Sequence, residues 1–187
     1  MKARDLDREM NAAARAVRLA HILRIESLGV PRMAIARVAA ILPPFGVQRV
    51  RWLSGCLYEP DDDGESAVIM PVPAAERGLG EIGLVDLLAF STNDPRKWSW
   101  RTGDGWALGE WCLDDHEAVV VETPLDWLAR SENAICVLNW SAPARCWSAL
   151  RSVPSLRFAN ETLRARAERA MRQAIALPDM GIIENAA

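Results

Sequence analysis

The chain has 187 residues, of which 50% are hydrophobic and 25% charged, and its formal net charge at pH 7 is −3. This length and apolar content predict one domain with a sizeable core and exclude wholesale disorder. The slightly acidic balance excludes a general nucleic-acid coat, although it is compatible with a local basic face.

The beginning of the chain and its cysteines indicate the compartment. Residues 1–17 are charged from the start and lack the apolar segment of a signal peptide, and no apolar run is long enough to span a bilayer. The four cysteines are widely spaced and include no CxxC pair, which favours reduced core thiols over a zinc site. We therefore expect a cytoplasmic protein without membrane association.

Residues 1–45 are predicted to form a helical lead. Between Arg4 and Ile25, apolar residues recur at spacings of three and four, which predicts one amphipathic helix. We expect Gly29 to end this helix and Pro31 to open a second, short one that runs through Ile41.

Residues 46–114 are predicted to form a small, mostly antiparallel β unit. The segments VQRVRWL, SAVIMPV and GLVDLLAF have the composition of strands. The acidic stretch YEPDDDGE lacks the ligand spacing of an EF-hand, so we expect a solvated hairpin loop there. KWSWRTGDGWALGEW predicts two further short strands of the same unit.

Residues 115–187 alternate strand and helix patterns. The strand-like segments EAVVVE, AICVLNW and PSLRFA are separated by the helix-like segments PLDWLAR and PARCWSALR, and ETLRARAERAMRQAI follows as a longer helix. This order predicts an α/β unit with a compact parallel sheet of at least three strands, covered by helices and packed with the β unit as one body. Functional groups gather at the carboxyl ends of such strands. We expect Glu122 and Ala159 to lie there, at neighbouring strand ends.

The stretch VVVETPLDWL resembles the first motif of Toprim domains in the DNA primases of phages and mobile elements. In that family a hydrophobic strand ends in Glu-Gly, and an Asp often follows near the start of the next helix. The segments AVIMPV, GLVDLLAF and KWSWRTGDGWALGE precede the motif in the family's order, so the resemblance covers residues 67–172. It implies a Toprim-like fold, in which a glutamate moves protons and two aspartates of a later Asp-x-Asp motif hold Mg²⁺ against phosphate oxygens.

The sequence departs from this family at decisive positions. Thr123 replaces the glycine, and Ala159 and Glu161 stand where the two aspartates of Asp-x-Asp are expected. Alanine cannot bind a metal. The resemblance therefore implies a degenerate site with Glu122, Asp126 and Glu161 as vestigial candidates, and we expect no catalytic residue, metal or cofactor; Mg²⁺ enters only if the chain is an enzyme.

A purely structural interpretation of the same residues remains open. Thr123 can cap the helix that Pro124 opens, and Asp126 then occupies the N3 position of a capping-box arrangement. Acidic residues in a first helical turn also suit the helix dipole.

Aromatic and basic residues are interleaved around residue 98. Arg96, Lys97 and Arg101 stand beside Trp98 and Trp100, a pattern that can pair phosphates and stack bases of single-stranded DNA. Alternation places the two indoles on one strand face and Lys97 and Arg101 largely on the other, so packing of the indoles in the core is the alternative. The three cations are the candidate nucleic-acid-binding residues.

The inventory of motifs does not support a hydrolase. His21 is expected to pack within the first helix, and His116 lies in an acidic loop without a nucleophile nearby; no G-x-S-x-G, P-loop or dinucleotide motif is present. The sequence thus favours a catalytically inactive, Toprim-like accessory protein of a phage or mobile element that acts in DNA replication or processing, with single-stranded DNA or a replication protein as partner. The alternatives are a protein–protein interaction module without a nucleic-acid role and a Mg²⁺-dependent, primase- or nuclease-like enzyme.

Overall fold

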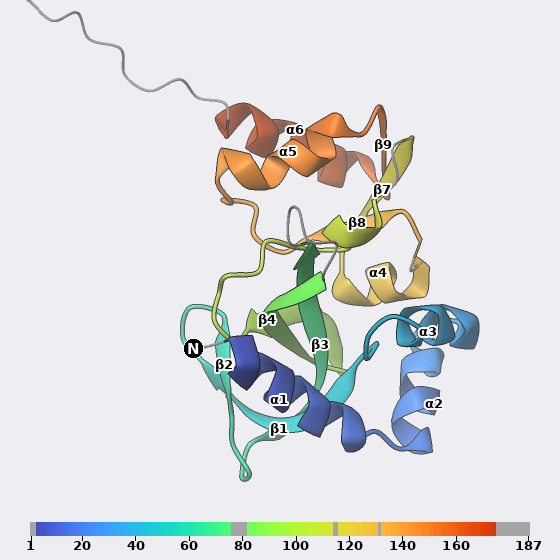
Figure 1. Cartoon of the computed structure of the whole chain (residues 1–187), viewed down its shortest axis with the longest axis vertical. Helices are drawn as coiled ribbons and strands as arrows, with labels where there is room; N and C mark the ends of the chain where they lie inside the picture. Colours follow the sequence, from blue (N-terminus) through green and yellow to red (C-terminus); the bar gives the residue numbers. More distant parts are fainter. Residues whose placement is uncertain (1–2, 76–81, 114–115, 131, 175–187) are drawn as a thin grey trace, which may run out of the picture.

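The computed structural model describes residues 3–75, 82–113, 116–130 and 132–174. The fold is mixed α/β, with a closed barrel of strand order β1-β2-β5-β4-β3 and a four-stranded sheet of order β6-β8-β7-β9 (Figure 1). The elements are α1 (Ala3–Arg15), α2 (Leu19–Ser27), α3 (Arg32–Ala39), β1 (Gly46–Leu53), β2 (Leu57–Pro60), β3 (Glu65–Ala75), β4 (Ile82–Ser91), β5 (Asp94–Trp100), β6 (Ala107–Leu108), the 3₁₀ turn η1 (Glu110–Cys112), β7 (Glu117–Val121), α4 (Pro124–Arg130), β8 (Ala134–Val137), α5 (Ala144–Ser152), β9 (Ser155–Phe158) and α6 (Glu161–Gln173).

The β unit is mostly antiparallel, as predicted, and it closes into a mixed barrel. Its strands pair antiparallel except that β2 and β5 meet in parallel at Leu57 and Trp100, the single register pair that joins them. Strand β2 takes up residues 58–60 of the stretch YEPDDDGE, for which the sequence predicts a hairpin loop. The reason is Tyr58, whose side chain is fully buried and ties this segment to the barrel core.

Helix α1 covers the barrel and completes its interior. Leu6, Met10 and Ala13 lie on one face of the helix, each only 3% exposed, and belong to the same cluster as Val50 and Ile69 of the strands. This packing requires a glycine where α1 crosses the start of β1. A Cβ on Gly46 would lie 2.5 Å from the Cβ of Ala13, which is closer than real side-chain contacts come.

The single amphipathic helix expected from Arg4 to Ile25 is wrong: the chain forms two helices with a break at Val17 and Arg18. Arg18 has an extended backbone, and its N–H donates to Nδ1 of His21 at 3.0 Å, so this histidine helps to start α2. The break lets α1 pack on the barrel while Ile25 of α2 enters a different cluster.

The carboxyl-terminal sheet has the predicted parallel core. Strands β8, β7 and β9 are parallel, with Val120 opposite Ile135 on one side and Phe158 on the other. Strand β6, expected in the β unit, instead joins the edge of this sheet antiparallel to β8. The backbone carbonyl of Trp106 helps to hold β6 against the end of β8, because it accepts hydrogen bonds from the N–H groups of Leu138 and Asn139 at 2.8 and 3.0 Å.

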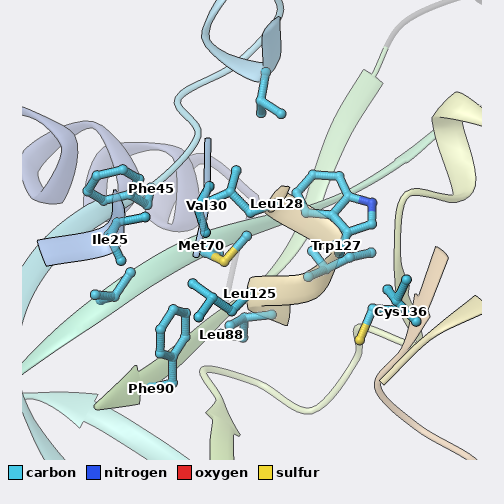
Figure 2. Packing of buried hydrophobic residues seen from close by; sticks show 14 of the residues in the cluster. Ile25, Val30, Phe45, Met70, Leu88, Phe90, Leu125, Trp127, Leu128 and Cys136 are labelled. Atoms are coloured by element: carbon cyan, nitrogen blue, oxygen red, sulfur yellow. The ribbon is translucent and has the colours of Figure 1, made fainter. Parts of the chain in front are cut away.

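Helices cover both faces of the four-stranded sheet. Helices α5 and α6 lie on one face, and α4 lies on the other, between the sheet and the barrel with α3 (Figure 1). Figure 2 shows the shared core on the α4 side, where Leu125, Trp127 and Leu128 lie in one cluster with Met70 of β3 and Leu88 of β4. The barrel and the sheet therefore share a continuous hydrophobic core.

Two of the predicted unit boundaries fall on residues outside the described ranges. They are the boundary between the β unit and the α/β unit at residues 114 and 115, and the end of the α/β unit at residue 187. Within the described ranges, no helix is both long and apolar enough to cross a bilayer.

Candidate nucleic-acid interface

Glu122 lies directly after β7, at the carboxyl end of the central strand. The N–H of Ala159 donates to the carbonyl of Val120 at 3.2 Å, which places the end of β9 beside it. The expectation that Glu122 and Ala159 lie at neighbouring strand ends is confirmed. The Glu122 side chain is exposed, and its Oε2 accepts from Nδ2 of Asn160 at 3.3 Å. A carboxylate in this position needs no buried partner, since water solvates it.

Asp126 serves the first turn of α4. Its Oδ2 accepts from the backbone N–H and the hydroxyl of Thr123 at 3.1 and 2.7 Å, and its own N–H donates to the Thr123 Oγ1 at 3.1 Å. This reciprocal pattern is a capping box, which satisfies N–H groups that the helix leaves free. The prediction that Thr123 and Asp126 form a capping box at the start of α4 is therefore confirmed.

Glu161 belongs to an ion-pair network on the surface of α6. Arg164 bonds both Glu161 and Glu168, and the pKa of Glu161 is lowered because the Arg164 guanidinium donates hydrogen bonds to it. The side chain is exposed at the start of the helix. Its carboxylate is thus engaged along its own helix.

The donor set at these strand ends does not fit the Mg²⁺ site of the family. The position after β9 supplies Ala159 and the amide of Asn160, whose Oδ1 accepts from the Leu163 N–H at 2.8 Å as the cap of α6. Mg²⁺ is held by one or two carboxylates together with phosphate oxygens. In the part of the chain that the structure describes, no group of three or more His, Cys, Asp or Glu side chains is arranged to hold a metal ion.

A thiol lies beneath this edge of the sheet. Cys136 of β8 is fully buried, and burial, followed by the negative charges of Asp126 and Glu122, raises the pKa of its thiol. A protonated, inaccessible thiol is not a nucleophile. Cys136 is therefore a core residue.

A hollow of about 470 Å³ lies between the barrel and the four-stranded sheet, and we call it the β5 groove. It combines cations and indoles from three separate parts of the chain. Its lining residues are Leu53, Cys56, Arg96, Lys97, Trp98, Ser99, Trp100, Leu138, Trp140 and Arg166.

The two β5 indoles serve the core and the groove at once. Trp98 and Trp100 are opposite Phe90 and Leu88 of β4, share their face of the strand, and pack partly buried against the main cluster. Both also line the β5 groove. These tryptophans therefore pack against the core and also contribute to the lining of the groove.

The far side of the groove is built by a cation and an indole that meet. The guanidinium carbon of Arg166 in α6 lies 4.5 Å from the centroid of the Trp140 ring, a cation–π contact. Trp140 is also tilted at 44° to Trp147, with the ring centroids 6.0 Å apart, and Trp147 is fully buried. The core thus holds one side of Trp140 in place.

Of the three predicted DNA-binding cations, the structure brings Arg96 and Lys97 to the groove and places Arg101 elsewhere. The Arg101 Nε donates to Oε2 of Glu9 at 2.9 Å, and its guanidinium lies over the ring of Tyr58, 5.9 Å from the centroid. The Tyr58 hydroxyl donates to the other Glu9 oxygen at 3.2 Å. Arg101 joins the barrel to α1.

Sequence reasoning missed Trp140 and Arg166. Trp140 follows β8 near its carboxyl end, where functional groups gather in parallel sheets, so this rule contained a usable signal. Arg166 stands in a helix of mixed charge, which predicts an ordinary solvated face. Its approach to Trp140 depends on tertiary packing alone.

A comparison with solved structures gives the fold a precedent. The chain is similar to a structure described as that of the DnaG catalytic core, with a TM-score of 0.62 and 17% sequence identity over 92% of this chain and 66% of that one. The likeness shows a primase-like fold. The chain spans about two thirds of the DnaG core. No protein-family model and no curated protein matches the sequence.

Proposed function

We propose that this protein is a catalytically inactive, Toprim-like accessory protein that binds single-stranded DNA along the β5 groove during DNA replication or processing. The observation that carries the proposal is the groove itself, where Arg96, Lys97 and Arg166 share one hollow with Trp98, Trp100 and Trp140. The setting in a phage or mobile element rests on the order of the sequence motifs.

The chemistry of the groove suits a single strand. Guanidinium and ammonium groups pair with phosphates, and indole faces stack bases without selecting a sequence. Attraction here is local, because the chain as a whole has a net charge of −3. We therefore expect binding confined to this groove.

The state of the carboxylates supports an inactive protein. Asp126 is bonded to Thr123, Glu161 to Arg164, and Glu122 to Asn160, so each acidic side chain has a separate local partner. Ala159 supplies no ligand at the adjacent strand end. The competing Mg²⁺-dependent primase or nuclease would need these groups to converge on one ion.

A protein–protein interaction module is the second candidate, and exposed apolar side chains of the helical lead favour it. Leu19 and Leu23 of α2 are 65% and 49% exposed, and Met33 of α3 is 66% exposed. Such side chains are typical of a surface that meets another protein when they are contiguous. In this second candidate the partner is another protein, and the chain has no nucleic-acid role.

Binding of a fluorescently labelled single strand, measured by anisotropy at several salt concentrations, tests the proposal. We expect affinity to fall steeply with salt, because each neutralised phosphate releases counterions. Arg166→Gln should weaken binding and make the slope of log K against log salt shallower by about 0.7, the value for one phosphate contact on a single strand.

Arg164→Gln is the matched control, since it removes the same charge two residues earlier on α6. Arg164 is engaged by Glu161 and Glu168 and does not line the groove, so the slope should stay unchanged. Absence of binding at low salt would refute the DNA-binding proposal and favour the interaction module.

A further inference from the structure

A second hollow lies next to the β5 groove, at the seam of the barrel. We call it the seam hollow; its volume is about 270 Å³, and its lining residues are Trp52, Ser91, Asp94, Lys97, Trp98 and Ser99. It shares Lys97, Trp98 and Ser99 with the β5 groove. A ligand in the groove can therefore reach it by crossing the side chains of β5.

The seam exists because β5 is paired on one side only over most of its length. β4 pairs with it from Asp94 to Trp100, whereas the register with β2 consists of Trp100 and Leu57 alone. Beyond this pair β2 gives way to the turn that leads back to β1. Trp52 of β1 then lines the seam hollow opposite β5.

Trp52 is held in a fixed orientation. Its Nε1 donates to Oε2 of Glu65 at 2.9 Å, and its ring packs, partly buried, against the barrel interior. The Trp52 ring is thus held by a hydrogen bond at its edge and by packing against the barrel interior, and the rest of its surface is available for stacking. Pre-organisation of this kind lowers the entropic cost of binding.

The charges of the seam hollow favour a neutral group. The Lys97 ammonium lies 2.9 Å from Oδ2 of Asp94, so the cation is balanced by a carboxylate within the same hollow. Ser91 and Ser99 add hydroxyl groups, which donate and accept. A neutral, planar group with hydrogen-bonding edges matches this lining better than an anion does.

We propose that the seam hollow binds a nucleobase, stacked on Trp52, of the same single strand whose phosphates occupy the β5 groove. This inference rests on the proposed function, because it needs the strand in the groove. It adds a base-binding site at the seam, beside Arg96 and Arg166, the two groove cations that do not line the seam hollow. The hydroxyls of Ser91 and Ser99 and the carboxylate of Asp94 meet the edge of that base.

The experiment compares two single strands of equal length, one with natural bases and one with a central run of abasic nucleotides. Both carry the same phosphates, so binding of the abasic strand reports the groove and the difference between the strands reports base stacking. Stacking on an aromatic side chain changes affinity on the order of 5- to 150-fold per base.

We expect Trp52→Ala to weaken binding of the natural strand by at least about 5-fold and to leave binding of the abasic strand unchanged. Trp52→Phe, which keeps an aromatic face, should retain part of the preference for the natural strand. Melting temperatures of both variants show whether they fold. Crosslinking of a 5-iodouracil strand to the unsubstituted protein gives a readout that does not depend on any variant. Adducts are expected at Trp52, which lines the seam hollow and does not line the β5 groove.

Three outcomes are distinguishable. If a folded Trp52→Ala protein binds both strands as the original does, or if adducts form at other residues and not at Trp52, the base site is wrong while the groove stands. If neither strand binds in a salt-dependent manner, the proposed function fails and the base site fails with it. Selective loss of natural-strand binding in Trp52→Ala together with adducts at Trp52 supports both.

Discussion

The strongest stability prediction concerns Asp86, a fully buried carboxylate in β4. Its Oδ1 accepts the N–H groups of Leu87 and Thr102 at 2.8 and 2.9 Å. Its Oδ2 accepts those of Gly103 and Gly105 at 2.9 and 3.0 Å. One side chain thus anchors the whole loop that leaves β5 and enters β6, where the chain passes from the barrel to the second sheet.

Asp86→Asn keeps the shape of the side chain and removes half of its acceptors. Whichever way the amide is turned, its NH₂ group faces two of the four backbone N–H donors. In either orientation one of these two donors is buried, and the other is only partly buried. A buried donor left without a partner costs about 1–3 kcal/mol, so we expect a loss of about this size in the free energy of unfolding. That is a large fraction of the 5–15 kcal/mol, roughly, that stabilises a typical domain.

Urea denaturation followed by tryptophan fluorescence measures this loss as a shift of the midpoint at constant m-value. Asp104→Asn is the matched control, since Asp104 lies in the same loop with an exposed side chain and should change stability by less than about 0.5 kcal/mol. Equal, small effects of the two substitutions would refute the argument that the buried carboxylate organises the loop.

Three further predictions follow from the structure. Thr123→Ala should lower the free energy of unfolding by about 1 kcal/mol, because it removes the cap of α4, whereas Glu122→Leu should change it by less than about 0.5 kcal/mol, since Glu122 is exposed. A larger effect of Glu122→Leu would contradict this capping interpretation. Mg²⁺ at millimolar concentration should leave the melting temperature unchanged in a thermal scan, and a rise that Glu122→Gln abolishes would instead establish a metal site. Glu9→Ala should lower the free energy of unfolding, measured by urea denaturation, by about 1–3 kcal/mol, because it leaves the Tyr58 hydroxyl and the Arg101 guanidinium without their shared acceptor. An unchanged urea midpoint would show that water replaces the carboxylate.

The carboxyl-terminal α/β unit follows from local pattern. Apolar strands such as EAVVVE and AICVLNW, separated by short helices, can bury both faces only in a parallel sheet with helices on either side, and the strands pair in that way. The neighbourhood of Glu122 and Ala159 follows in turn, because parallel strands end at the same edge. The Thr123–Asp126 cap is equally local, since it joins residues three positions apart.

The barrel needed information that local pattern does not carry. The acidic content of residues 58–65 predicts a loop, yet burial of Tyr58 makes β2 a strand. The short β6 has the composition of the β unit, and it pairs instead with β8 because the loop anchored by Asp86 directs it there. The barrel closes through the single pair of Leu57 and Trp100, which are far apart in the sequence, so local pattern does not predict this closure.

Part of the candidate interface was likewise predictable from the sequence, and part depends on the tertiary structure. The sequence by itself determined that cations and indoles are interleaved on β5. It also determined that Ala159 and Glu161 stand where the resemblance to Toprim domains would place the aspartates of Asp-x-Asp. Only the tertiary structure decided that Arg101 turns to Glu9, and that Arg166 meets Trp140 across the groove from Lys97. The physical reason is that hydrophobic periodicity specifies which face of an element is buried, whereas the partner of each exposed side chain depends on how the barrel and the sheet dock through their common core.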